Sequence, residues 1–67
     1  MTEENRKLQE ALSKAMYDIF RCAELSNNQI KNSNDEDLIE VNSCIMQAVE
    51  LISQAQALHQ DATDTID

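Results

Sequence analysis

A chain of 67 residues holds at most one small domain, and the absence of Gly and Pro, with a single Tyr and a single Phe, argues against a sheet-rich fold with tight turns. The formal charge of −8 lies in one half, because residues 1–31 carry five acidic and five basic residues whereas residues 32–67 carry eight acidic residues and no Lys or Arg. This distribution disfavours nucleic acid and anionic membranes as partners, and no apolar run is long enough to cross a bilayer.

The first element expected is a helix from about residue 2 to about residue 30. The Thr2 hydroxyl can cap it, and Glu3 and Glu4 suit the positive end of the helix dipole. Apolar residues recur at helical spacing along one broad face. Those that alternate four and three apart are assigned to a bundle core, and they are Leu8, Leu12, Ala15, Ile19 and Cys22.

A turn is expected at about residues 31–34. Residues 27–35 lose the apolar period and are rich in Asn, Ser and Asp, which favour turns and helix caps. Ser33 followed by Glu36 predicts a capping box for the next helix. Because the connection is short, we expect the two helices to be antiparallel neighbours.

The second helix is expected from about residue 35 to about residue 63, since the acidic residues that follow are unfavourable at a helix C-terminus. Two apolar stripes run side by side along it. The stripe assigned to the bundle core contains Val41, Ile45, Ala48, Ile52, Ala55 and His59. The neighbouring stripe contains Cys44, Leu51 and Leu58 and shares the alanines.

Two stripes on each helix are more apolar surface than one partner helix can cover. A short chain usually supplements its small core with disulfides, metal or oligomerisation, and the residues for the first two are poorly represented here. We therefore predict an all-α fold, a single domain over residues 1–67, in which an antiparallel two-helix hairpin dimerises into a four-helix bundle.

The two cysteines and the single histidine are expected to be structural. Cys22 and Cys44 fall on the apolar faces and are predicted to act as small buried core residues, with redox sensing or an inter-helix disulfide as the alternative. His59 completes no zinc-binding set and is expected at the bundle end, with a pH-dependent dimer as the alternative. No metal or cofactor is predicted. The polar first residues do not resemble a signal peptide, so we expect a cytoplasmic protein.

Several exposed side chains are candidates for binding another protein. Tyr17 lies in the middle of the polar face of the first helix, one turn from Arg21, and exposed Tyr with Arg is typical of an interface hot spot. Met46 lies outside the apolar sector of the second helix. The full candidate set is Lys14, Tyr17, Phe20, Arg21, Met46 and Glu50. The ordinary alternatives are isolated exposed aromatics, a Phe20 that seals the dimer rim, and a solvated acidic helix.

The layout resembles three groups of small helical proteins. It is similar to the plasmid-encoded Rop-type hairpins, acidic two-helix chains that dimerise and bind RNA, for which Lys14, Phe20 and Arg21 would be the counterparts of the binding residues. It also resembles sporulation phosphatases of the Spo-zero-E type, which carry a Ser-x-x-x-Asp motif. Here Ser43 is followed by Gln47 at the fourth position, so that activity is not implied. Size and acidity alone resemble small phage-encoded inhibitors of host regulators.

These observations favour a regulatory protein over an enzyme, since no group of residues has catalytic spacing and no Gly-rich loop is possible. The acidic second helix predicts a protein partner with a basic surface, such as the DNA-binding region of a transcription factor, which a phage-type anti-activator would mask. The alternatives are a Rop-like RNA-binding regulator and a structural subunit or secretion co-chaperone.

Overall fold

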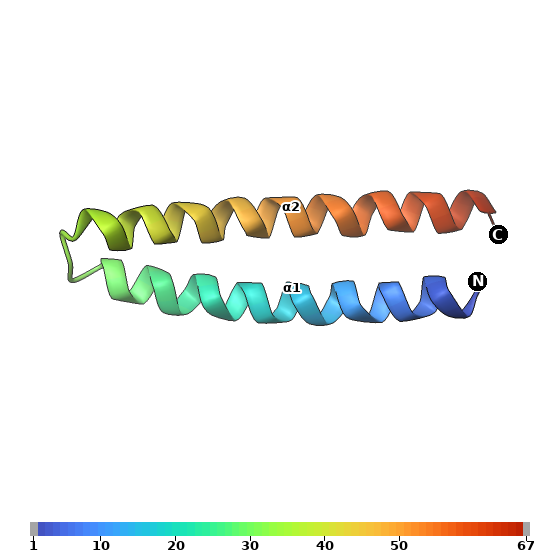
Figure 1. The fold of residues 1–67 in the computed structure, drawn as a ribbon, viewed down its shortest axis with the longest axis horizontal. Helices are drawn as coiled ribbons and strands as arrows, with labels where there is room; N and C mark the ends of the chain where they lie inside the picture. The colour runs from blue at the N-terminus through green and yellow to red at the C-terminus, as the bar shows by residue number, and fades with distance from the viewer. Residues whose placement is uncertain (1, 67) are drawn as a thin grey trace.

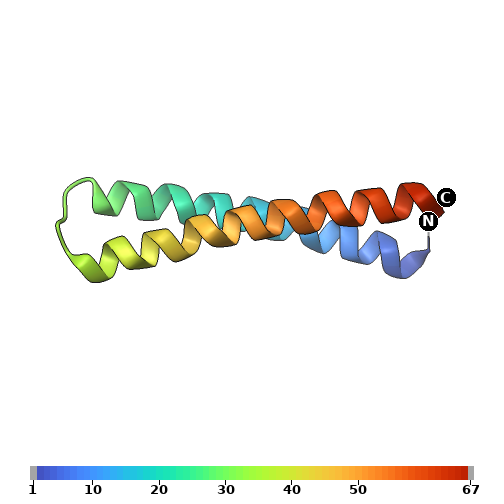
Figure 2. The same ribbon diagram turned by 90° about the horizontal axis from the view of Figure 1, so that it is seen from above.

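The computed structural model describes residues 2–66, with side chains described for residues 2–64. Two α-helices, α1 (Glu3–Ile30) and α2 (Glu36–Ile66), lie side by side and run in opposite directions, so that the connecting turn is at one end of a rod (Figure 1). Seen from above, the helices cross at a shallow angle (Figure 2). The predicted all-α antiparallel hairpin is confirmed.

The helix boundaries follow from local hydrogen bonds. Thr2 caps α1 as predicted, because its Oγ1 accepts from the backbone N–H of Asn5 at 3.2 Å. The predicted capping box at Ser33 is wrong. Ser33 Oγ accepts from the N–H of Asp35 at 3.1 Å and so closes the turn, while Asp35 Oδ1 caps α2 by accepting from the N–H of Asp37 at 2.9 Å.

The second helix is longer than predicted, since α2 continues to Ile66 instead of ending near residue 63. Thr63 explains part of this difference. Its side chain is buried, and its hydroxyl donates to the carbonyl oxygen of Gln60 at 3.0 Å. Packing of this residue between the helices therefore holds the last turns, in spite of the acidic residues that oppose the helix dipole there.

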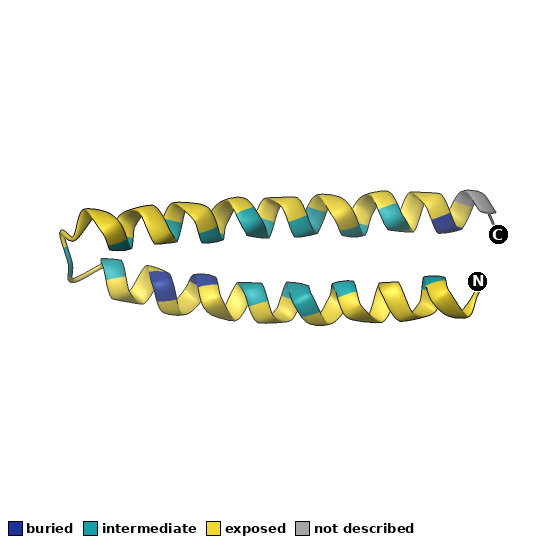
Figure 3. Cartoon of the chain, viewed as in Figure 1, coloured by how far each residue is buried: buried dark blue, intermediate teal, exposed yellow. Residues whose placement is uncertain are grey.

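Buried and half-buried side chains occupy the facing sides of the two helices, which we call the seam (Figure 3). Its members alternate four and three apart, as in a coiled coil. On α1 they are Leu12, Met16, Ile19, Ala23, Ser26 and Ile30, and on α2 Leu38, Asn42, Ile45, Val49, Ile52, Gln56, His59 and Thr63. Among the described residues no large side chain is completely buried, so the seam is a narrow core.

Polar contacts across the seam set its register. Asn42 Nδ2 donates to Ser26 Oγ at 3.0 Å and to Asn27 Oδ1 at 2.7 Å. Nearer the open end, Gln56 Nε2 donates to Ser13 Oγ at 3.4 Å. In each of these pairs the two residue numbers add to 68 or 69. A residue of α1 and a residue of α2 whose numbers have this sum therefore lie at the same level along the rod.

The hairpin is elongated and exposes much surface. It measures 49 × 15 × 13 Å, and its radius of gyration of 15.3 Å exceeds the ~11 Å expected of a compact chain of this length. Its accessible surface is 5204 Å², whereas a folded monomer of 7.6 kDa exposes about 4300 Å². The chain thus leaves about 900 Å² uncovered beyond what a compact monomer of its mass would expose.

Candidate protein interface

Tyr17 and Phe20 form an exposed group on α1 with two charged neighbours. Tyr17 is 70% exposed and Phe20 is 53% exposed. Tyr17, Phe20, Arg21 and Glu24 surround one shallow hollow, and we call these four residues the aromatic patch. The structure therefore brings together three of the candidates from the sequence. Their composition, two aromatic rings beside a guanidinium, is typical of binding hot spots.

Met46 extends this side of the molecule onto α2. Ser13 and Ser53 line a common pocket between the helices. Phe20 lies two turns after Ser13, and Met46 lies two turns before Ser53, so both point to the same side of the hairpin as that pocket. Met46 is exposed, as the sequence predicts.

The remaining two candidates lie apart from each other. Lys14 is exposed one turn before Tyr17, on the outer surface of α1, and Glu50 is exposed one turn after Met46, on the outer surface of α2. A single small partner element centred on the aromatic patch would therefore reach one of them more easily than both.

The opposite side of the hairpin carries a second exposed apolar surface. Cys22, Leu25, Val41 and Ile45 line one groove, and Val41 and Ile45 also line an adjoining groove with Cys44. Residues seven or fourteen positions away along each helix continue the same side. We call this surface the leucine face, and its large or sulfur-containing members are Leu8, Cys22, Leu25, Val41, Cys44, Leu51 and Leu58.

The residues that the sequence assigned to one bundle core divide into two groups. The first group is half-buried within the hairpin. Its members in the seam are Leu12, Ile19, Ile45, Ile52 and His59, and its members at the border of the seam are Ala15 and Ala48. Exposed positions on the leucine face are held by Leu8, Cys22, Val41 and Ala55. Only the second group is left for a second molecule to cover.

Leu25 is a member of the leucine face that the sequence interpretation missed. It is 58% exposed and lines the same groove as Cys22. The residues of the first helix that the sequence assigns to the bundle core end at Cys22, and so they do not include Leu25, three residues on. A repeat through Leu8, Ala15, Cys22 and Leu25 would have found it, but Asp18 interrupts that repeat.

Both thiols are exposed in the hairpin, so the predicted burial of Cys22 and Cys44 does not occur within one chain. They lie on the leucine face, beyond the edge of the seam. Over residues 2–64, no group of three or more His, Cys, Asp or Glu side chains is arranged to hold a metal ion.

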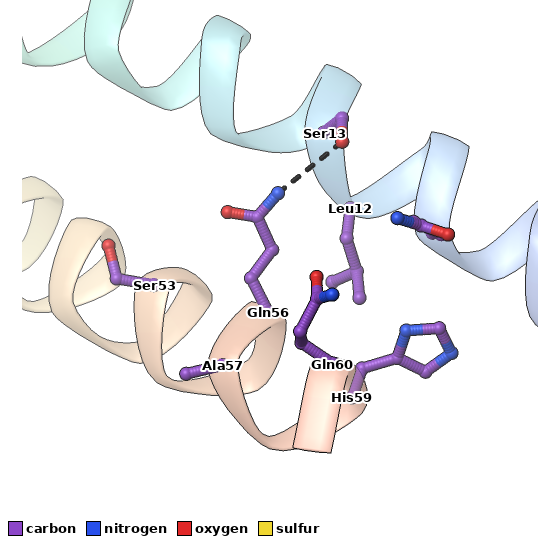
Figure 4. Close-up of a pocket in the computed structure, with 8 residues that line it drawn as sticks. Leu12, Ser13, Ser53, Gln56, Ala57, His59 and Gln60 are labelled. Atoms are coloured by element: carbon purple, nitrogen blue, oxygen red, sulfur yellow. Dashed lines mark hydrogen bonds between the residues drawn. The ribbon is translucent and has the colours of Figure 1, made fainter. Parts of the chain in front are cut away.

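His59 lies in the seam near the open end, at a pocket that it shares with Gln9, Leu12 and Gln60 (Figure 4). Its Nε2 is buried and has no hydrogen-bond partner among the described residues. The ring points away from the hydrogen bond between Gln56 and Ser13 (Figure 4). A buried nitrogen without a partner is destabilising, so this position weakens the seam.

Charge separates the two helices. Six acidic residues and no Lys or Arg lie within α2, whereas α1 carries four basic residues with its five acidic ones. Arg6 is paired within α1, at 2.6 Å from Glu3 and 2.7 Å from Glu10. The hydrogen bond to Glu3, and then the charge of Glu10, raise the pKa of Arg6 above its ordinary value. Because α2 has no Lys or Arg to offset its six acidic residues, it forms the most acidic surface of the hairpin.

Comparison of the chain with protein-family models, with curated proteins and with solved structures finds no match. Neither helix, over its described residues, combines the length and apolar character needed to cross a membrane.

Proposed function

We propose that this chain is a small cytoplasmic regulatory protein that forms a homodimeric four-helix bundle and binds another protein, whose activity it inhibits or modulates. The observation that carries the proposal is the exposure of large apolar side chains on two separate sides of one thin rod. One side is the leucine face, and the other contains Phe20 and Met46. Contiguous apolar patches of this kind mark interaction surfaces in small proteins.

The two sides suit different partners. The leucine face consists almost entirely of aliphatic and small residues along α2, which is typical of contacts between identical subunits. The aromatic patch mixes rings with Arg21 and Glu24, which is typical of the contacts made with other proteins. A dimer formed through the first side leaves two copies of the second side exposed.

The partner is a protein with a basic surface. The acidic residues of α2 give the dimer a strongly negative surface, which attracts and orients a basic partner. The DNA-binding region of a transcription factor has this character, and masking it would make the chain an anti-activator of the kind that phages encode.

Wild type and two variants test the proposal by affinity capture from the source organism at low and at high salt. Wild type and the control variant Gln54→Ala should capture the same partner, because Gln54 is exposed away from the aromatic patch. Tyr17→Ala should lose it, and capture by wild type should weaken as salt screens the charges. A partner whose capture depends neither on Tyr17 nor on salt would refute the proposal.

Binding of structured RNA is the second candidate, because Phe20 and Arg21 line one hollow and Lys14 lies one turn away. A gel shift with structured RNA, performed at several salt concentrations, separates the two functions. Complex formation that weakens steeply with salt would favour RNA. A chain that is monomeric and poorly folded when purified alone would instead favour a structural subunit or a co-chaperone.

A further inference from the structure

We propose that a second copy of this chain covers the leucine face in the parallel orientation, with both hairpin turns at the same end, so that α1 of each copy packs on α2 of the other. This inference rests on the dimer of the proposed function and specifies how its two chains are arranged. Parallel and opposite orientations are the two ways in which identical hairpins can pack face to face with two-fold symmetry.

The amount of exposed surface fits a second copy. The hairpin exposes 5204 Å², which is about 900 Å² more than a compact monomer of its mass. A stable interface of standard size covers about 800 Å² on each partner. Along α2 the leucine face runs from Val41 to Ala62 without a charged residue, so an apolar strip of most of the helix is available for this contact.

The charge on α2 decides between the two orientations. In the opposite orientation α2 lies along α2 of the second copy, which places two helices with six acidic residues each, and no Lys or Arg, side by side. In the parallel orientation each α2 lies between two α1 helices, which carry most of the basic residues. The two acidic helices are then diagonal to each other and farther apart, which reduces their repulsion.

One residue on α1, Asp18, favours the same choice. In the opposite orientation, let the two-fold axis cross α2 at Leu51, the middle of the apolar strip. By the register of the hairpin, the same level on α1 lies between Tyr17 and Asp18. Asp18, which lies in the α1 repeat of the leucine face, is then level with Asp18 of the second copy. This contact joins like charges, which are destabilising when they lie directly opposite each other.

The parallel orientation separates the two Asp18 carboxylates, because the two α1 helices are then diagonal to each other. Asp18 lies level with Leu51 on the leucine face of the second copy, and Glu50, at the same level, is on the outer surface of α2. Because its two-fold axis runs along the rod, each residue of α1 meets residues of the second copy at the level fixed by the register of the hairpin.

The cysteines make the orientation measurable. Their numbers add to 66, so Cys22 and Cys44 lie within ~4 Å of the same level at 1.5 Å per residue. In the parallel orientation the thiols of both copies therefore meet in one layer. In the opposite orientation centred on Leu51, Cys44 of one copy lies at the level of Leu58 of the other, ~21 Å from the second Cys44.

The test mixes Cys22→Ser protein with Cys44→Ser protein, so that a disulfide can form only between chains. The mixture is unfolded, refolded together, sized by light scattering and oxidised with copper–phenanthroline. Two Cu(II) ions accept the two electrons that the thiols lose, and the two protons pass to the buffer. The parallel orientation predicts a Cys22–Cys44 bond between chains in the mixed dimers, seen on a non-reducing gel and by mass spectrometry. In the control, the same mixture is oxidised in urea, and the yield of the Cys22–Cys44 product should fall.

A second measurement does not depend on thiol reactivity or on these two positions. In a chain with both native cysteines changed to Ser, Asn32→Cys carries a spin label in the turn. The parallel orientation predicts a distance between labels well below half of the 49 Å rod, and the opposite orientation a distance close to its full length. A dimer with distant labels and no disulfide overturns the parallel orientation alone. A monomer overturns it together with the proposed dimer.

Discussion

Replacing Leu51 by Gln should weaken the dimer without weakening the hairpin. Leu51 lies in the middle of the leucine face and is 65% exposed in the single chain. Burying a fully exposed Leu side chain contributes about 1.5–3 kcal/mol, so covering the exposed part of Leu51 contributes about 1–2 kcal/mol in each copy. Two-fold symmetry doubles the effect, and the dissociation constant should rise about 30- to 700-fold.

Sedimentation equilibrium over a range of concentrations measures this change directly. Gln has nearly the helix propensity of Leu, so circular dichroism should show the same helical content in both proteins. Met46→Gln is the matched control, because Met46 is also exposed on α2 but lies on the other side, and its dimer should be unchanged within about 0.5 kcal/mol. A Leu51→Gln chain that dimerises as tightly as wild type would show that the leucine face is not the interface.

Four substitutions test the seam and the turn, each by urea denaturation of the purified chain. Asn42→Ala should lower the free energy of unfolding by about 1–2 kcal/mol, since it removes a cross-helix hydrogen bond from Ser26; an unchanged value would mean that this contact does not form. His59→Leu should raise it by about 1 kcal/mol, because a buried nitrogen without a partner is replaced by an apolar side chain. Asp35→Ala should cost about 1 kcal/mol as the loss of a helix cap, and more than Ser33→Ala; the reverse order would restore Ser33 as the cap.

The helices and their turn were predictable because they depend on local sequence. The spacing of Leu12, Ile19, Ile45 and Ile52 indicates two amphipathic helices, and the Asn- and Ser-rich segment between them indicates the turn. The residue that caps α2 was harder to choose. Ser33 and Asp35 are both good caps, and which one acts depends on how tightly the chain closes the turn.

The seam was less predictable, because hydrophobic periodicity ranks polar residues low. Asn42, Gln56 and Thr63 occupy inner positions of α2, and two of them do so by hydrogen bonding to residues of α1 far away in the sequence. Such pairs are decided by register and not by local pattern. Because these polar residues occupy inner positions, apolar residues such as Leu51 lie outside the seam, on the leucine face.

For the candidate binding residues, helical angles were enough to place Tyr17 and Met46 on the surface. They were not enough to show that Phe20 and Met46 share one side while Lys14 and Glu50 do not. That relation depends on how the two helices are rotated against each other, which the polar contacts of the seam determine.

The ladder of cross-helix contacts has a consequence for how the chain unfolds. The contact of Asn42 with Ser26 lies nearer the turn, and the contact of Gln56 with Ser13 lies nearer the chain ends, so the second pair encloses the first along the sequence. Losing the outermost contact leaves the inner ones intact, whereas opening an inner contact while the outer ones hold frees only a segment that is still tied at both ends and so gains less entropy. Local opening should therefore start where the two chain ends meet, and amide hydrogens there should exchange with deuterium before those next to residues 31–35.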